Sequence, residues 1–129
     1  MREILFRGKR KENGYWIDGG FCEYRNFSGE QVYNIIHNGY SNEVIPETVG
    51  QYTGLTDKNG TKIFEGDIVE DFIPFNMGLY DTNKYLVEYS DSLCGFKPFC
   101  ESDHYGDTII EQCKIIGNIH DNPELLKGK

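Results

Sequence analysis

The sequence predicts a mainly β protein with few short helices, and three observations support this fold class. The 129 residues include no alanine, although alanine is the strongest helix former. Isoleucine, valine and threonine are frequent and 14% of the residues are aromatic, all types that fit a pleated sheet. Asn-Gly pairs and other glycine-containing turn signals recur between short apolar stretches. The length suits one ordinary domain or two small ones.

The first expected element is a β-hairpin. Residues 3–7 form a short apolar stretch, and residues 12–15 contain an Asn-Gly turn signal. Residues 15–17 begin the return strand, which residues 21–24 continue. The Gly-Gly pair at 19–20 permits a bend or a bulge between them.

A second hairpin is expected directly after it. Residues 31–36 are strand-like, residues 37–40 contain another Asn-Gly turn, and residues 42–45 form the return strand. Pro46 ends that strand, because proline has no N–H to donate to a neighbouring strand.

The following segment alternates extended stretches with turns. Residues 51–55 are extended, residues 57–60 turn, and residues 61–64 leave that turn. Residues 65–67 form a second turn, and residues 68–72 are the next strand. Such a Gly-Asp-apolar-Val strand start is typical of small β-barrels.

The last third of the chain is expected to contain three more strands. We predict a loop at 74–83, a strand at 84–89, a short edge strand at 95–99, a final strand at 113–119, and a helical turn at 122–126 that Asn122 caps. The stretch most like a domain boundary lies near residues 46–50. We therefore expect an N-terminal β subdomain at 1–48, a second β domain at 49–126 and a frayed tail at 127–129.

The charge balance excludes some classes of protein. There are 13 basic and 21 acidic residues, a net charge of −8, which disfavours a general binder of nucleic-acid phosphates. No apolar run approaches the roughly 20 residues that span a bilayer. Residues 1–11 contain no long apolar core of the kind that a secretion signal needs. We expect a soluble, cytoplasmic protein with no membrane partner.

The first hairpin is nevertheless basic. Residues 1–12 hold five basic and two acidic residues, whereas the other 117 hold eight basic and nineteen acidic. A basic hairpin on an acidic body suits contact with a nucleic acid or an acidic partner, while a solvated strand edge is the simpler interpretation. The candidate contact residues are Arg7, Lys9, Arg10, Lys11 and Trp16.

Aromatic residues are numerous in the same half of the chain. On an exposed sheet they would stack on single-stranded bases or anchor a protein partner, and in the interior they would pack between strands. Interior packing is the more usual role. The residues concerned are Tyr15, Trp16, Tyr24, Tyr33, Tyr40 and Tyr52.

No catalytic or metal-binding motif is found. The cysteines at 22, 94, 100 and 113 match no common zinc spacing, so we predict free, largely buried thiols. Asp103, His104 and Asp107 are close enough in sequence to hold one ion, but polar clusters are ordinary in solvated loops. Phosphate-binding and nucleophile-elbow glycine patterns are absent. We therefore predict no metal, no cofactor and no enzymatic activity, and a small metal-dependent enzyme is the least favoured alternative.

Three long stretches resemble one known family. They are residues 2–9 with the Gly-Tyr-Trp at 14–16, residues 43–69, and residues 115–126. Together they resemble the YopX family over roughly residues 1–126. The resemblance implies a product of bacteriophages or prophages without an assigned biochemical role, an SH3-like barrel at 49–126, and no catalytic residues to carry over. The matching turn positions Gly54, Gly60, Gly66 and Asp67 are then fold determinants.

The resulting prediction is a non-enzymatic binding or assembly module in the cytoplasm of a bacterial host cell. Its partner would be another protein or a second copy of itself, since unpaired strand edges and exposed aromatics favour self-association. The alternative is a nucleic-acid-binding accessory protein that uses the basic N-terminal hairpin.

Overall fold

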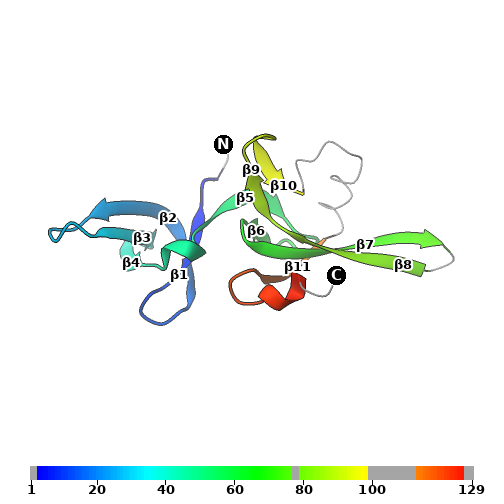
Figure 1. Ribbon diagram of the computed structural model, residues 1–129, viewed down its shortest axis with the longest axis horizontal. Helices are drawn as coiled ribbons and strands as arrows, with labels where there is room; N and C mark the ends of the chain where they lie inside the picture. The colour runs from blue at the N-terminus through cyan, green and yellow to red at the C-terminus, as the bar shows by residue number, and fades with distance from the viewer. Residues whose placement is uncertain (1–2, 77–78, 99–112, 127–129) are drawn as a thin grey trace. The chain divides into compact units, whose positions relative to one another are not determined.

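The computed structural model describes residues 3–76, 79–98 and 113–126, with only the backbone described at 72–76 and 79–82. The fold is mainly β, as the sequence predicts, and the helical elements within those ranges are two short 3-10 helices. The chain divides into two compact units, Met1–Tyr52 and Thr53–Lys129. Figure 1 shows the strands of the first unit in blue to cyan and those of the second in green to orange.

The N-terminal unit contains β4, β3, β2, β1 and the start of β5, the first five strands of a sheet whose order is β4-β3-β2-β1-β5-β6. The pairs β1–β2, β2–β3, β3–β4 and β1–β5 are antiparallel. The pairs β1–β2 and β3–β4 confirm the two predicted hairpins. A 3-10 helix, η1, follows β4. The elements are β1 (Phe6–Lys9), β2 (Trp16–Arg25), β3 (Gln31–His37), β4 (Tyr40–Glu43), η1 (Pro46–Thr48) and the start of β5 (Gly50–Thr56).

The turn between β3 and β4 shows why the Asn-Gly signal is informative. Asn38 has φ 50° and Gly39 has φ 82°. Two consecutive positive φ angles define a type I′ turn, whose twist matches that of the flanking strands. Asparagine and glycine tolerate this conformation best, so the two residues fix the register of the hairpin.

One face of this sheet forms the core of the N-terminal unit. Ile35 and Val44 are almost fully buried. The ring of Phe21 lies between two others, 5.6 Å from the centroid of Phe6 and 6.3 Å from that of Tyr33. These residues come from β1, β2, β3 and the position directly after β4, so the aromatic stack helps to hold the sheet together.

The chain directly after β1 pairs with the chain directly after β4. Arg10 forms an isolated antiparallel bridge with Val44. Two backbone hydrogen bonds of 2.9 Å flank this bridge: Lys11 N–H to the Glu43 carbonyl, and Ile45 N–H to the Lys9 carbonyl. The chain leaving β1 therefore covers the last part of the outer edge of β4.

The C-terminal unit contains the rest of β5 and two further sheets. One has the order β11-β7-β8 and the other pairs β9 with β10. Between the described strands these sheets remain open, so the predicted SH3-like barrel stays a prediction. The elements are β6 (Lys62–Phe64), β7 (Asp67–Asn76), β8 (Leu79–Leu86), β9 (Glu88–Ser90), β10 (Gly95–Lys97), β11 (Lys114–Asn118) and η2 (Pro123–Leu126).

The loop predicted at residues 74–83 is wrong. β7 and β8 form a long antiparallel hairpin whose register pairs Pro74 with Tyr80 and Asp71 with Asn83. The register shifts between Pro74 and Asn76, at a bulge of the kind that accommodates a proline within a strand. The proline and the polar residues at 81–83 are typical of loops, so the sequence pattern did not predict these strands.

The single strand predicted at residues 84–89 is interrupted at Val87. The N–H of Val87 donates to the carbonyl of Asp67 over 2.8 Å, and the Val87 carbonyl accepts from the N–H of Gly66 over 2.7 Å. Val87 is fully buried. The chain then changes partner and enters β9, which pairs with β10 instead of β7. This pairing of Val87 with a turn 20 residues earlier divides the predicted strand.

The core of the C-terminal unit gathers around four fully buried residues: Ile63, Val69, Val87 and Cys113. Next to this core, the buried side chain of Asp57 connects two distant segments. Its Oδ1 accepts the N–H groups of Asn59 and Thr61, and its Oδ2 accepts the N–H of Ile115 over 3.0 Å. One carboxylate therefore shapes the turn after β5 and attaches it to β11.

Helix η2 confirms the helical turn predicted at the C-terminal end, although the predicted side-chain cap differs. The carbonyl of Asn122 accepts the N–H of Leu125 over 3.1 Å. Its side-chain Oδ1 accepts the N–H of Asn118, at the end of β11. The asparagine side chain therefore connects η2 to β11 in place of capping the helix.

Candidate partner-binding site

The five candidate residues of the basic hairpin all lie in the N-terminal unit, but they form two separate groups. The register opposes Lys9 to Trp16 and Arg7 to Asp18, which places Arg7, Lys9 and Trp16 on one face of the sheet. The guanidinium of Arg7 lies 4.7 Å from the centroid of the Trp16 ring, and the Lys9 ammonium lies 5.8 Å from it. These are cation–π distances, so both cations are held against the indole.

Arg10 and Lys11 belong to the turn that follows β1, and both are paired with acids. The Arg10 guanidinium lies 2.9 Å from the Glu12 carboxylate. The Lys11 ammonium lies 3.1 Å from the carboxylate of Glu43 on β4. The sequence placed these cations near one another, but the acidic partner on β4, 32 residues away, follows only from the fold.

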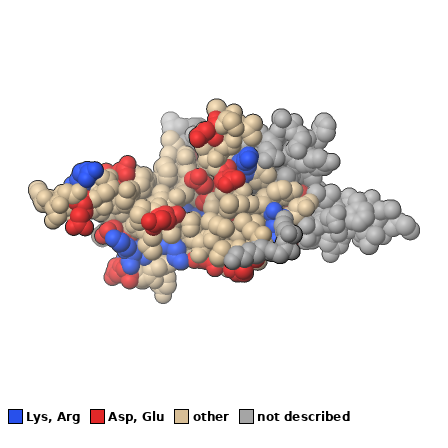
Figure 2. Space-filling model, in the orientation of Figure 1, with Lys and Arg blue, Asp and Glu red and all other residues tan. Residues whose placement is uncertain are grey.

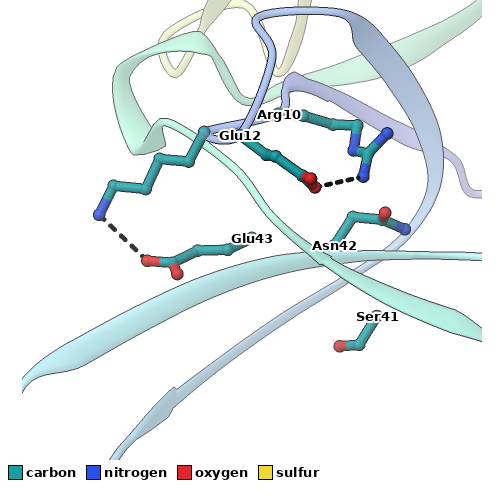
Figure 3. Close-up of a pocket in the computed structure, with 6 residues that line it drawn as sticks. Arg10, Glu12, Ser41, Asn42 and Glu43 are labelled. Atoms are coloured by element: carbon teal, nitrogen blue, oxygen red, sulfur yellow. Dashed lines mark hydrogen bonds and ion pairs between the residues drawn. The ribbon is translucent and has the colours of Figure 1, made fainter.

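A polar cleft of about 360 Å³ lies between this turn and β4. In Figure 3, Arg10 and Glu12 lie on one side of the cleft, and Ser41, Asn42 and Glu43 lie on the other. Lys11 completes the lining. The walls therefore carry two cations, two carboxylates and two neutral polar side chains.

The charges around this unit are mixed. Figure 2 shows Lys and Arg interspersed with Asp and Glu on the face in view, without one continuous basic area. With Arg10 and Lys11 both joined to carboxylates, residues 3–12, the described part of the basic segment, do not present a row of cations to solvent. This arrangement differs from a phosphate-binding surface, in which lysine and arginine face the nucleic acid together.

Exposed aromatic side chains mark the turns of the same unit. Tyr15 is 72% exposed, Tyr40 is 76% exposed and Phe27 is fully exposed. Tyr24, near the end of β2, is about half exposed. The expected interior packing therefore holds for Tyr33, which stacks in the core, and not for Tyr15, Tyr24 and Tyr40.

The turn that presents Phe27 is internally bonded. The side-chain Oδ1 of Asn26 accepts the N–H of Ser28 over 3.0 Å and the N–H of Glu30 over 2.9 Å. The Arg25 guanidinium donates to the carbonyl of Gly29 over 3.0 Å. Sequence reasoning missed Phe27, although an aromatic residue within an Asn-x-Ser-Gly turn between two strands is a detectable signal.

The cysteines give a mixed result. Cys22, Cys94 and Cys113 are free, as predicted, but Cys22 and Cys94 are exposed and only Cys113 is buried. Burial, followed by the nearby charges of Asp57 and Asp71, raises the pKa of the Cys113 thiol to about 11. The fourth cysteine, Cys100, lies outside the described residues.

The predicted metal cluster of Asp103, His104 and Asp107 also lies outside the described residues. Within the described ranges, no three acidic, histidine or cysteine side chains are placed to hold one ion. The same ranges contain no helix with the length and apolarity needed to cross a bilayer.

Comparison with known proteins agrees with the resemblance noted in the sequence. No curated protein matches the chain. Among solved structures, the crystal structure of protein EF1440 from Enterococcus faecalis is similar, with a TM-score of 0.59 and 23% identity, over 98% of this chain and 100% of that one. This likeness concerns the fold. The model of the family described as "YopX protein" matches residues 5–127, nearly the whole length. The chain belongs to the YopX family.

Proposed function

We propose that this protein is a non-enzymatic binding or assembly module, encoded by a bacteriophage or prophage, whose N-terminal unit contacts a protein. The partner is a host or phage protein, or a second copy of the chain. The observation that carries the proposal is the set of aromatic side chains exposed at the turns of this unit, above all Phe27.

The energetics favour a binding role for these aromatics. Burying an exposed phenylalanine is worth roughly 1.5–3 kcal/mol, and aromatic residues are enriched among the residues that dominate protein interfaces. The bonds from Asn26 and Arg25 hold the turn around Phe27 before any partner arrives. A preformed turn loses less conformational entropy on binding than a flexible one.

The electrostatics support a protein partner over a nucleic acid. The net charge is −8, and the cations at positions 10 and 11 are joined to carboxylates. A phosphate backbone approaching this turn would meet Glu12 and Glu43 beside the two cations. A protein surface carries charges of both signs and can therefore complement the mixed charges of this turn.

An SH3-like barrel in the C-terminal unit is part of the same proposal. It rests on the family likeness and on the Gly-Asp turn that begins β7. Small barrels commonly act through their loops and strand edges, although fold by itself does not assign function. The C-terminal unit would then serve as a second contact surface or as the framework of the module.

The test is affinity capture of the tagged full-length chain from bacterial lysate, with and without nuclease, read by mass spectrometry. The matched variants are Phe27→Ser with Tyr15→Ser in the N-terminal unit, and Leu93→Ser, which alters a 45% exposed leucine of the C-terminal unit. We expect one nuclease-resistant protein, or the chain itself, to be captured. The first pair of substitutions should abolish capture and the Leu93 variant should retain it.

Two results would contradict the proposal. One is capture of a nuclease-sensitive mixture of proteins, which would support nucleic-acid binding instead. The other is capture that is indifferent to the Phe27 and Tyr15 substitutions.

A further inference from the structure

The outer edge of β4 has backbone groups that point away from the sheet. The N–H of Val44 donates to the carbonyl of Tyr33, which makes Val44 and Tyr33 a hydrogen-bonded pair of the antiparallel ladder. Because such pairs alternate along the strands, Asn42 and Tyr40 also direct their backbone groups toward β3. Ser41 and Glu43 therefore direct theirs outward.

Among the described residues, the chain pairs with this edge at its far end. The Glu43 carbonyl accepts the N–H of Lys11. Beyond that bond the turn at 10–12 diverges from β4, and the polar cleft of about 360 Å³ opens between them. Ser41 and Glu43, whose backbone groups point away from β3, both line this cleft.

The composition of the walls selects among possible occupants. All six lining residues are polar or charged, which disfavours an apolar small molecule. The carboxylates of Glu12 and Glu43 disfavour a polyanion, and both are already neutralised by cations, which disfavours a metal ion. An extended peptide can form hydrogen bonds with the outward backbone groups of this edge, since its main chain supplies both donors and acceptors at the spacing of a strand.

We propose that the cleft between residues 10–12 and β4 binds an extended segment of a protein partner, which adds a strand to the open edge at Ser41. This inference rests on the proposed protein-binding function and names the mode of contact. Main-chain hydrogen bonds to Ser41 and Glu43 hold the segment. The volume corresponds to the small end of ligand pockets, so the strand added here is short.

The two ion pairs provide a means of selecting the segment. The Lys11 side chain is 60% exposed and that of Glu43 is 47% exposed. Exposed pairs of this kind contribute only about 0–1 kcal/mol, so they open readily. A segment with an acidic or a basic side chain beside the edge would exchange partners with Lys11 or Glu43, at little cost to the fold.

The experiment uses a library of random twelve-residue peptides selected against the full-length protein. A synthetic copy of the most enriched peptide is then titrated against labelled protein, while amide hydrogen exchange is followed residue by residue. We expect exchange at the Ser41 and Glu43 amides to slow by about tenfold or more when the peptide binds.

Two substitutions at Ser41 separate the backbone contact from the side chain. Ser41→Pro removes the outward N–H and leaves the ladder to β3 intact, and proline is tolerated on an edge strand. Ser41→Ala keeps that N–H. We expect the proline variant to bind the peptide roughly tenfold more weakly and the alanine variant to stay within about twofold of the wild type.

Any of three results would overturn the inference: no enriched peptide, unchanged exchange at Ser41 and Glu43 when a peptide binds, or full affinity in a folded Ser41→Pro variant. The exchange measurement uses the unmodified chain, so it decides the matter even if the proline variant fails to fold. If Ser41→Pro keeps the partner captured from lysate while the Phe27 and Tyr15 substitutions lose it, the proposed function stands and the cleft is not its site.

Discussion

Gly19, in the middle of β2, occupies a position with no room for a side chain. A Cβ atom built on it would lie 2.0 Å from the carbonyl oxygen of Ile36 on β3. Its neighbour Gly20 has nothing within 4 Å of such an atom. The sequence indicates that the Gly-Gly pair is special, but it does not distinguish the two glycines, because the obstructing atom belongs to another strand.

The Gly19→Ala variant should therefore be strongly destabilised and Gly20→Ala should not. We expect Gly19→Ala to lower the free energy of unfolding by roughly 1–3 kcal/mol or more, since backbone atoms must move apart. Gly20→Ala should be neutral or gain about 0.4–1 kcal/mol, because alanine restricts the unfolded chain. Urea unfolding of the two variants side by side measures the difference, and equal stabilities would show the close approach at Gly19 to be absent.

The buried thiol of Cys113 makes stability depend on pH in alkali. Its pKa in the folded protein is about 11, against an ordinary value of 9.0. Between these values the folded state holds a proton that the unfolded state has released, so its contribution is complete below pH 9 and is lost as pH rises toward 11. We expect a loss on the order of 2 kcal/mol between pH 8.5 and 11.

Other groups also titrate in alkali, so the measurement is a comparison. Urea unfolding of the wild type and of Cys113→Val between pH 8 and 11 should show a shallower decline for the variant, which keeps the packing and removes the proton. The exposed Cys22→Ser variant is the control and should follow the wild type. Parallel curves for the wild type and Cys113→Val would contradict the assigned cause.

At the scale of elements, the Asp57 carboxylate connects the turn after β5 to β11. Its carboxylate accepts three backbone N–H groups, two in the turn before β6 and one at Ile115 in β11. Asp57→Ala leaves all three without that acceptor, and we expect it to lower the free energy of unfolding by roughly 2–4 kcal/mol. Asp57→Asn keeps one carbonyl oxygen as an acceptor, so its free energy of unfolding should lie between those of the wild type and of Asp57→Ala.

The matched control is Asp91→Ala in the turn between β9 and β10. Asp91 is exposed, and its backbone carbonyl, which the substitution keeps, accepts the N–H of Cys94. We expect its effect to stay within about 0.5 kcal/mol. Thermal unfolding of the three variants gives the comparison, and a neutral Asp57→Ala would show that water replaces the carboxylate without loss.

The sequence predicts an element correctly where the residue types of a turn determine its backbone conformation. Asn38 and Gly39 adopt the positive φ angles that their residue types favour, and the hairpin around them was predicted correctly. Prediction failed where distant residues decide, as when Val87 pairs with Gly66 and Asp67 and thereby ends β8. The same holds for the candidate site. Its basic residues were identified from sequence, but the partner of Lys11 on β4 and the cleft beside it depend on the fold.

At the scale of the whole molecule, charge opposes binding to nucleic acid. The net charge is −8, and the cations at positions 10 and 11 lie in ion pairs. We expect labelled single-stranded and duplex DNA to bind more weakly than about 100 μM in 0.15 M salt. Fluorescence anisotropy over a salt series checks this. Tighter binding that falls steeply with salt, and that is lost when Arg7, Lys9, Arg10 and Lys11 are replaced by alanine, would support the nucleic-acid alternative.

The strand order also determines when each strand can pair with its neighbour in the sheet during synthesis. Every strand pair of the N-terminal unit, including Phe6 with Gln51, becomes available once residue 52 has left the ribosome. In the C-terminal unit, β7 must wait for β11 at Lys114–Asn118, the last strand of the sheet. Until then the nascent β7–β8 hairpin has one side without its neighbour, a template for pairing with other chains. Slow translation through the intervening residues would therefore favour misassembly in the C-terminal unit, while the N-terminal unit already has all of its strands.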